Sequence, residues 1–103
     1  MEKISMNTVK AINRVQGYQW FEASTMRFFK SRVGKVAYRT GDNAYFISSE
    51  QFVNLVNGTV EPRFYTIRIC NLIAGNIDTI GDFQEFETRQ QAKAKIMAII
   101  GDK

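Results

Sequence analysis

Apolar and polar residues alternate over a long stretch near the middle of the chain. Over residues 65–70 every second side chain is apolar, which is the period of a strand with one buried face. Gly75 lies where the chain must turn, and a second alternating run begins at Ile77. This alternation slips by one residue at Gly81, which is typical of a bulge or a bend. We therefore predict a central β-hairpin within residues 63–86.

Helical spacing of apolar residues predicts a first helix at residues 6–16. Val9 lies on the apolar side of this segment, and either Ser5 or Asn7 has the side chain of an N-cap. Gly17 follows, as is common after the end of a helix.

The C-terminal segment has the helix signals of both ends. Thr88 and Gln91 have the spacing of a capping box, and Gly101 follows a helix that is predicted to end at Ile100. The apolar face of this helix consists of Ala92, Ile96 and Ile99. We expect that face to cover the central hairpin.

Between these segments the pattern is less regular. Ser24 is in the position of an N-cap for a short helix over residues 25–32, and two strands are predicted at 35–39 and 44–47 around a turn. A serine and a glutamine with capping-box spacing predict another short helix over residues 48–52.

These elements together predict an α+β fold, with a small antiparallel sheet of about four strands packed against the N- and C-terminal helices. The strands follow one another without a strand–helix–strand rhythm, so we expect the helices to cover one face of the sheet. A chain of 103 residues has room for one core, which predicts a single domain over residues 1–103.

Three of the four residues from Tyr18 to Phe21 are aromatic. We expect Trp20 and Phe21 to pack in the core, as buried strand segments do. The alternative is that this segment stacks on nucleic-acid bases, because an aromatic ring can stack on any base.

The net charge of +4 is unevenly distributed along the chain. Residues 1–40 include eight basic and two acidic side chains, whereas the remainder has six basic and eight acidic ones. A basic field attracts nucleic acid or an acidic protein surface, and an ordinary solvated face is the alternative. The candidate partner-binding residues are five basic side chains and one aromatic anchor expected to be exposed, namely Arg27, Lys30, Arg32, Lys35, Arg39 and Tyr38.

The sequence contains no arrangement specific for catalysis or metal binding. Four acidic residues close in sequence could supply a carboxylate pair or a Mg²⁺ site, but solubility and the helix dipole explain them more simply; they are Asp78, Asp82, Glu85 and Glu87. It has no histidine and a single cysteine, Cys70, which we expect to be a small buried strand residue. The glycines form no phosphate-binding motif. We therefore expect no enzymatic activity, no cofactor and no metal. The lone cysteine and the lack of a long apolar run favour a cytoplasmic protein.

Three blocks of sequence follow one another in a characteristic order. They are T-M-R-F-F-K-S-R-V at 25–33, Y-F-I-S-S-E-Q-F at 45–52, and R-F-Y-T-I-R at 63–68, which leads to I-D-T-I-G-D-F-Q-E-F at 77–86. This order resembles a family of small uncharacterised proteins encoded mainly by bacteriophages and prophages, over about residues 7–99. The first block is the most specific part of the resemblance. The chain departs from the family at Tyr18 and Gln19, where a histidine or another small pattern flanking the aromatic residues would be expected.

The resemblance implies a phage accessory protein without an established activity. Small phage proteins that lack catalytic motifs often bind host proteins, including CRISPR effectors and restriction enzymes. We therefore expect a protein of the bacterial cytoplasm that binds and inhibits a host defence nuclease complex through a basic and aromatic face, as a monomer or weak dimer. The alternative is a small DNA- or RNA-binding phage protein that uses the same basic residues on phosphates.

Overall fold

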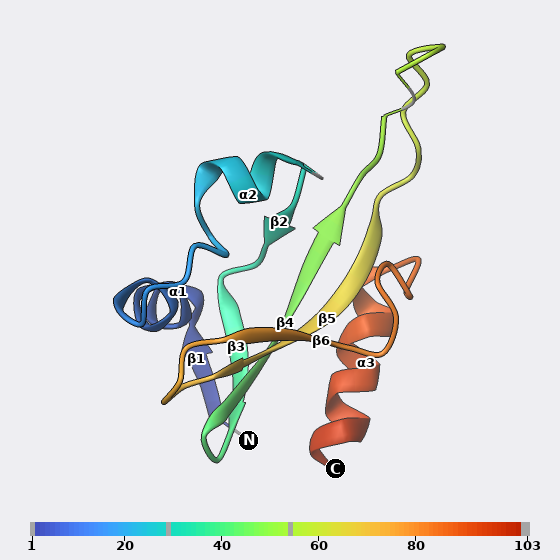
Figure 1. The fold of residues 1–103 in the computed structure, drawn as a ribbon. Helices are drawn as coiled ribbons and strands as arrows, with labels where there is room; N and C mark the ends of the chain where they lie inside the picture. The colour runs from blue at the N-terminus through green and yellow to red at the C-terminus, as the bar shows by residue number, and fades with distance from the viewer. Residues whose placement is uncertain (1, 29, 54, 102–103) are drawn as a thin grey trace.

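A computed structural model describes residues 2–28, 30–53 and 55–101, which form an α+β fold (Figure 1). In chain order the elements are β1 (Glu2–Ser5), α1 (Met6–Val15), α2 (Ala23–Phe28), β2 (Arg32–Val33), β3 (Val36–Thr40), β4 (Asn43–Glu50), β5 (Phe64–Asn71), β6 (Ile77–Ile80) and α3 (Arg89–Ile100).

The described strands form a six-stranded antiparallel sheet. Its order is β1-β3-β4-β5-β6, and β2 pairs with the end of β4 that β3 leaves open. At the centre, β4 and β5 pair along their whole length, from Asn43 opposite Asn71 to Glu50 opposite Phe64. The predicted central hairpin is β5 and β6, with Gly75 in the turn at a φ of 82°. The antiparallel α+β class is confirmed, but the sheet has more strands than the four predicted.

The additional strands, β1 and β2, are too short to show a recognisable period. β1 contributes one half-buried apolar side chain, Ile4, which pairs with Ala37 of β3. β2 has only two residues, and Val33 pairs with Ser48. A period of two cannot be distinguished over so few positions, so these strands depend on partners that are distant in sequence.

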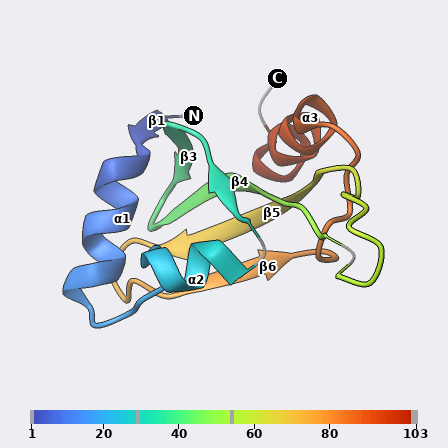
Figure 2. The same cartoon turned by 90° about the horizontal axis from the view of Figure 1, so that it is seen from above.

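Helices cover both faces of the sheet, contrary to the expectation that they share one. α1 and α2 lie on one face and α3 lies on the other (Figure 2). The reason is visible in β4, in which successive side chains are buried on opposite faces. Phe46 belongs to the core under α1, whereas Ile47 belongs to the core under α3. A strand with apolar side chains on both sides needs a cover on both sides.

The two terminal helices are confirmed with their caps. The Ser5 side chain accepts a hydrogen bond from the Asn7 backbone N–H at 3.1 Å, so Ser5 is the N-cap of α1. Thr88 and Gln91 form the capping box of α3, and Gly101 ends the helix in the left-handed conformation.

Two predicted short helices differ from the structure. α2 begins at Ala23, so Ser24 lies inside the helix instead of capping it, and Phe29 of the predicted segment is outside the described residues. The helix predicted at residues 48–52 is wrong, because residues 48–50 continue β4 and pair with β5. Eight consecutive ladder pairs outweigh a local capping signal.

The chain between β4 and β5 projects from the body of the molecule (Figure 1). We call this segment, residues 51–53 and 55–62, the β4–β5 arm. Its base is held by a bridge between Val53 and Val60 and by a hydrogen bond from the Glu61 N–H to the Phe52 carbonyl at 2.9 Å. At its tip the apolar residues Leu55 and Val56 are 94% and 97% exposed.

Candidate functional site

The predicted basic residues do not form one group. Arg27 lies in α2, and the Lys30 N–H donates to the Arg27 carbonyl at 3.1 Å, so these two residues are neighbours. Arg32 is opposite Ser49, and it lines a small pocket together with Arg89 of α3, which is on the other face of the sheet. Lys35, which precedes β3, lies beside the first residue of α1. Its backbone carbonyl accepts a hydrogen bond from the Met6 N–H at 2.9 Å.

Arg39 and Tyr38 lie away from α2, on β3. The guanidinium of Arg39 is 3.4 Å from the Glu2 carboxylate, in an exposed ion pair between β3 and β1. Tyr38 was expected to be an exposed anchor, and this is wrong: it is 4% exposed and packs under α3 with Ile47 and Ile67. An aromatic residue in a strand that is covered on both faces is buried whichever way it points.

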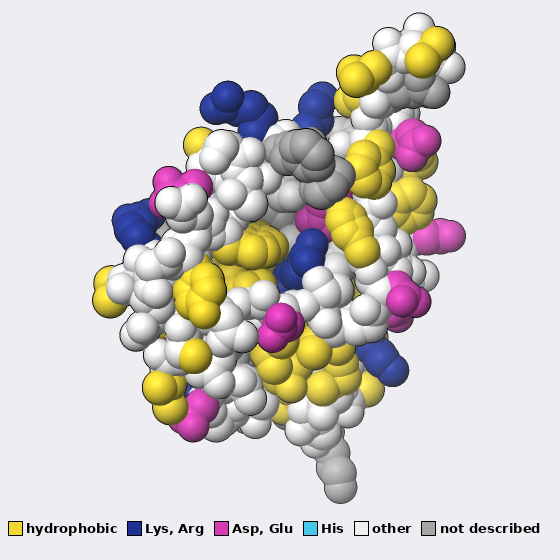
Figure 3. All heavy atoms as spheres, in the orientation of Figure 1, with side chains coloured by type: hydrophobic (Ala, Val, Ile, Leu, Met, Phe, Trp, Pro, Cys, Tyr) yellow, Lys and Arg dark blue, Asp and Glu magenta, His cyan; other side chains and the backbone are white. Residues whose placement is uncertain are grey.

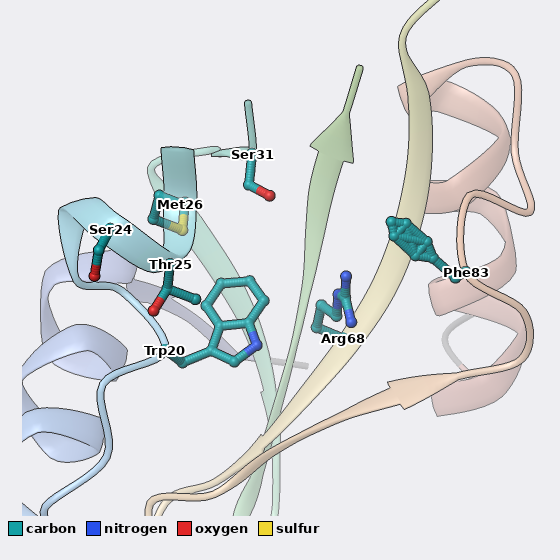
Figure 4. Close-up of a pocket in the computed structure, with 7 residues that line it drawn as sticks. All are labelled: Trp20, Ser24, Thr25, Met26, Ser31, Arg68 and Phe83. Atoms are coloured by element: carbon teal, nitrogen blue, oxygen red, sulfur yellow. The ribbon is translucent and has the colours of Figure 1, made fainter. Parts of the chain in front are cut away.

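A pocket lies beside α2, on the face of the sheet that α1 also covers. This pocket, of about 590 Å³, has one wall made by α2 and its flanking residues, a second wall made by Phe83, and Arg68 of β5 between them (Figure 4). Figure 3 shows the same side of the molecule, with hydrophobic side chains around a basic one. The residues of the α2 wall are Trp20, Ser24, Thr25, Met26 and Ser31.

Trp20 joins the pocket to the core, so the expected core packing is confirmed, and the same residue also lines the pocket. Its ring meets Phe21 edge-on at 4.8 Å and Phe46 at 5.6 Å between centroids. The Thr25 hydroxyl donates to the Gln19 carbonyl at 2.9 Å, which ties the first turn of α2 to the residue before Trp20. One edge of the indole is therefore fixed in the core, while Trp20 also lines the pocket.

The segment after α2 is anchored to the sheet by Arg63. Its guanidinium donates to the Lys30 carbonyl at 2.8 Å and to the Ser49 carbonyl at 3.0 Å. Burial lowers the pKa of Arg63, and the charge of Arg32 lowers it further. These bonds hold the α2 wall, including Ser31, against β4.

Arg68 is held in the pocket by polar groups on the same face of the sheet. Its Nε donates to the Ser48 hydroxyl at 3.0 Å, and its Nη1 donates to the Thr79 hydroxyl. The guanidinium carbon lies 5.4 Å from the Trp20 ring centre and 5.5 Å from that of Phe83, so the cation sits between two aromatic rings (Figure 4). Burial lowers the pKa of Arg68, and the charge of Glu50 partly opposes that effect.

Glu50 lies behind Arg68 and is only 1% exposed. Its Oε1 accepts from the Thr66 hydroxyl at 2.8 Å and lies 3.7 Å from Nη2 of Arg68. Among the described residues its Oε2 has no hydrogen-bond partner. A carboxylate is tolerated at this depth because a cation and a hydroxyl compensate it.

The same polar layer positions Phe83. Gln84, which has a φ of 58°, donates from its backbone to the Thr66 hydroxyl at 2.8 Å and from its side chain to the Glu50 carbonyl at 3.0 Å. The Phe83 ring stacks on Phe52 at the base of the β4–β5 arm, with 6.2 Å between centroids. Phe83 is thereby presented to the pocket from a loop that is fixed on both sides.

Sequence reasoning missed Arg68, Glu50 and Phe83 as site residues. The signal present in the sequence was a row of polar side chains, Ser48 and Glu50 in one strand and Thr66 and Arg68 in the next, on positions that alternate with apolar ones. Because residues 48–52 were predicted as a helix, Ser48 and Glu50 were not assigned to one face of a strand, and this row was missed.

Comparison with known protein families identifies the chain. The model of DUF7447, a family of unknown function, matches residues 5–97. The chain belongs to this DUF7447 family. No curated protein and no solved structure matches it. Every residue that lines the pocket lies within the matched range.

Two further observations concern other kinds of site. Among the described residues, no helix is both long enough and apolar enough to cross a membrane. Within the same residues, no three His, Cys, Asp or Glu side chains are grouped so that they could hold a metal ion. The pocket itself is lined by aromatic side chains, one cation and several hydroxyl groups.

Proposed function

We propose that the protein is an accessory protein of the phage type that acts by binding and not by catalysis, and that it binds unpaired nucleic acid on the face formed by α2. One observation carries this proposal. A tryptophan and an arginine share an open pocket beside α2, and the neighbouring basic residues Arg27, in α2, and Lys30, just after it, lie on the same wall segment.

This combination matches what a single strand offers. Unpaired bases expose flat aromatic faces, which stack on residues such as Trp20 and Phe83, and base stacking is sequence-tolerant. The phosphates between the bases attract exposed basic side chains, here Arg27 and Lys30. A duplex would keep its bases stacked on one another and out of the pocket.

A titration of labelled single-stranded DNA and RNA at several salt concentrations tests the proposal. Binding should weaken steeply with salt, because each neutralised phosphate releases counterions. The variant Arg27→Ala/Lys30→Ala removes two phosphate contacts and should give a log–log salt slope that is shallower by about 1.4.

The matched control is Lys93→Ala/Lys95→Ala, which removes the same charge from exposed positions of α3 on the opposite face. It should leave the salt slope nearly unchanged. A flat titration with both nucleic acids at low salt, or an equal loss in the control, would contradict the proposal.

A second candidate function is inhibition of a host defence nuclease complex, the role that the phage resemblance implies. The exposed apolar tip of the β4–β5 arm favours it, because Leu55 and Val56 are side chains that a protein partner would bury. In this function the exposed basic residues Arg27 and Lys30 face an acidic groove of the target. Replacing both by Ala should abolish inhibition while the melting temperature stays nearly constant.

A pull-down from host lysate, split into nuclease-treated and untreated halves, distinguishes the two functions. A defence protein that stays bound after nuclease treatment, and is lost with Leu55→Ser/Val56→Ser, supports the inhibitor. Recovery of nucleic acid alone, lost on treatment, supports the first function and removes the second.

A further inference from the structure

Arg68 presents hydrogen-bond donors, and no acceptor, to the pocket. An arginine side chain carries five N–H donors in a fixed plane. The Ser48 hydroxyl accepts a hydrogen bond from the Nε–H, and the Thr79 hydroxyl accepts one from Nη1, which carries two protons. One Nη2 proton is directed to the Glu50 ion pair at 3.7 Å, and among the described residues the second Nη1 proton and the other Nη2 proton have no hydrogen-bond acceptor and remain for a ligand.

Glu50 does not offer its own oxygens to a ligand. It is almost completely buried behind Arg68, and it does not line the pocket. Its effect is to hold the guanidinium in place and keep it charged. The floor of the pocket is therefore a donor fork, and a complementary ligand must bring two adjacent acceptors.

The aromatic walls add a second requirement, which is a flat ligand. Trp20 and Phe83 stand on opposite sides of the Arg68 guanidinium (Figure 4). A planar ring that enters the pocket beside Arg68 can stack one of its faces on one of these aromatic rings and place its edge against the Arg68 guanidinium. A volume of about 590 Å³ is ample for one base and lies within the usual range for ligand pockets.

From this arrangement we infer that the pocket binds an unpaired guanine, with its O6 and N7 on the Arg68 guanidinium and its ring against the aromatic walls of the pocket. This inference rests on the proposed nucleic-acid function. Guanine presents two acceptors side by side on this edge, and arginine is their most common partner. Adenine presents the N6 amino donor beside its N7 acceptor, so its amino group would face an N–H donor of the guanidinium and form no hydrogen bond.

The protein contains a direct probe of this pocket, because Trp20 is its single tryptophan. Four nonamers of thymidine, each with G, A, C or T at the central position, are titrated at low salt while tryptophan fluorescence is followed. The midpoints are compared, and not the amplitudes, because bases differ in how strongly they quench. The G oligonucleotide should bind about tenfold more tightly than the A oligonucleotide.

Two variants and one control test which residues produce the preference for G over A. Arg68→Lys keeps the charge but loses the donor fork, so its preference for G over A should disappear. Arg39→Lys, in the exposed ion pair with Glu2, is the control and should keep the preference. Phe83→Ala, at a partly exposed position, should weaken G and A binding alike by about tenfold.

The outcomes separate this inference from the function on which it rests. Equal midpoints for all four oligonucleotides, with a fluorescence change, would overturn the guanine site and leave nucleic-acid binding intact. Tightest binding of C, or binding seen by a label on the DNA without any change at Trp20, would also overturn the guanine site. No binding by any oligonucleotide would overturn both. Even if Arg68→Lys fails to fold, the midpoints of the four oligonucleotides with the unmodified protein test whether the pocket prefers guanine.

Discussion

At the scale of single residues, the pocket depends on an ion pair buried inside a sheet. Glu50 and Arg68 are 1% and 14% exposed, and each is further bonded to a hydroxyl of a neighbouring strand. Such a pair adds little net stability, because both ions lose hydration. Removal of one partner is costly, since the other is left buried and uncompensated.

Glu50→Ala should therefore lower the free energy of unfolding by about 3 kcal/mol. Glu2→Ala breaks the exposed ion pair with Arg39, whose side chains are 61% and 45% exposed, and should cost less than about 1 kcal/mol. Urea denaturation of both variants measures the two values. Equal costs would mean that Glu50 is better solvated than its burial indicates.

Cys70 links stability to pH through burial. Burial raises the pKa of its thiol above the ordinary value of 9.0, so the folded protein retains the proton when the unfolded chain loses it. A raised pKa contributes stability below pH 9 that is lost as the pH rises. Between pH 7 and pH 10 the unfolding free energy of the wild type should fall by up to about 1 kcal/mol more than that of Cys70→Ala. Parallel pH profiles in urea denaturation would contradict this.

At the scale of elements, the helices contact the sheet through few side chains. α3 buries Ala92 and Ile96 against β4 and β5, and the predicted third member of that face, Ile99, is 38% exposed. Ile100 packs against the core in its place. The apolar face of α3 is therefore rotated slightly from the one that the sequence pattern indicated.

Ile96→Ala should cost about 3 kcal/mol, because it leaves a cavity in the core under α3. Ile99→Ala removes the same atoms from a partly exposed position on the same helix and should cost less than about 1 kcal/mol. Thermal and urea unfolding of the pair tests the placement of α3. A cooperative, undestabilised Ile96→Ala protein would show that this helix packs differently.

The turn between β5 and β6 packs closely on α1. Gly75 has a φ of 82°, and a Cβ atom there would lie 2.7 Å from the Gln16 side chain and 3.1 Å from the Ile12 carbonyl. Asn13, buried in α1, donates to the Gly75 carbonyl at 2.8 Å. The turn is therefore part of the interface between α1 and the sheet.

Gly75→Ala should destabilise the protein by at least about 1 kcal/mol more than Gly41→Ala. Gly41 also has a positive φ, of 58°, but a Cβ atom at Gly41 would have no described neighbour within 4 Å, so its substitution costs only the backbone strain. The difference between the two unfolding free energies isolates the contact with α1. Identical values would mean that this turn does not touch the helix in solution.

At the scale of the whole molecule, the two faces of the sheet have different roles. The face under α3 is closed by an apolar core, whereas the face under α1 and α2 is apolar at one end and polar at the other, where the pocket opens. The β4–β5 arm extends beyond the body of the molecule, and its base is joined to the pocket through Phe52 and Phe83. Both candidate binding features therefore lie near one end of the central strands.

Leu55→Ser/Val56→Ser should leave the free energy of unfolding within about 0.5 kcal/mol of the wild type, because both side chains are already exposed. The urea midpoint measures this, and Phe46→Ala, at a buried position, provides a contrast with an expected loss of about 4 kcal/mol. A large loss in the tip variant would mean that the tip is covered, for instance by a second copy of the chain.

Much of the fold could be predicted because its signals are local. The caps of α1 and α3, the Gly75 turn and the alternation of β5 each arise from residues within a few positions of one another. The helix predicted over residues 48–52 failed for the opposite reason. Its capping signal was local, but pairing of Glu50 with Phe64, fourteen positions away, decided the conformation.

The sequence by itself determined the α+β class, the antiparallel central hairpin and the two terminal helices, because hydrophobic period and capping act along the chain. Only the tertiary structure decided which face each helix covers, that Tyr38 is buried, and that Trp20, Arg68 and Phe83 form one pocket. These results depend on strand register and on burial from both sides of a sheet. Both are set by contacts between residues that are far apart in the sequence, which a pattern along the chain does not contain.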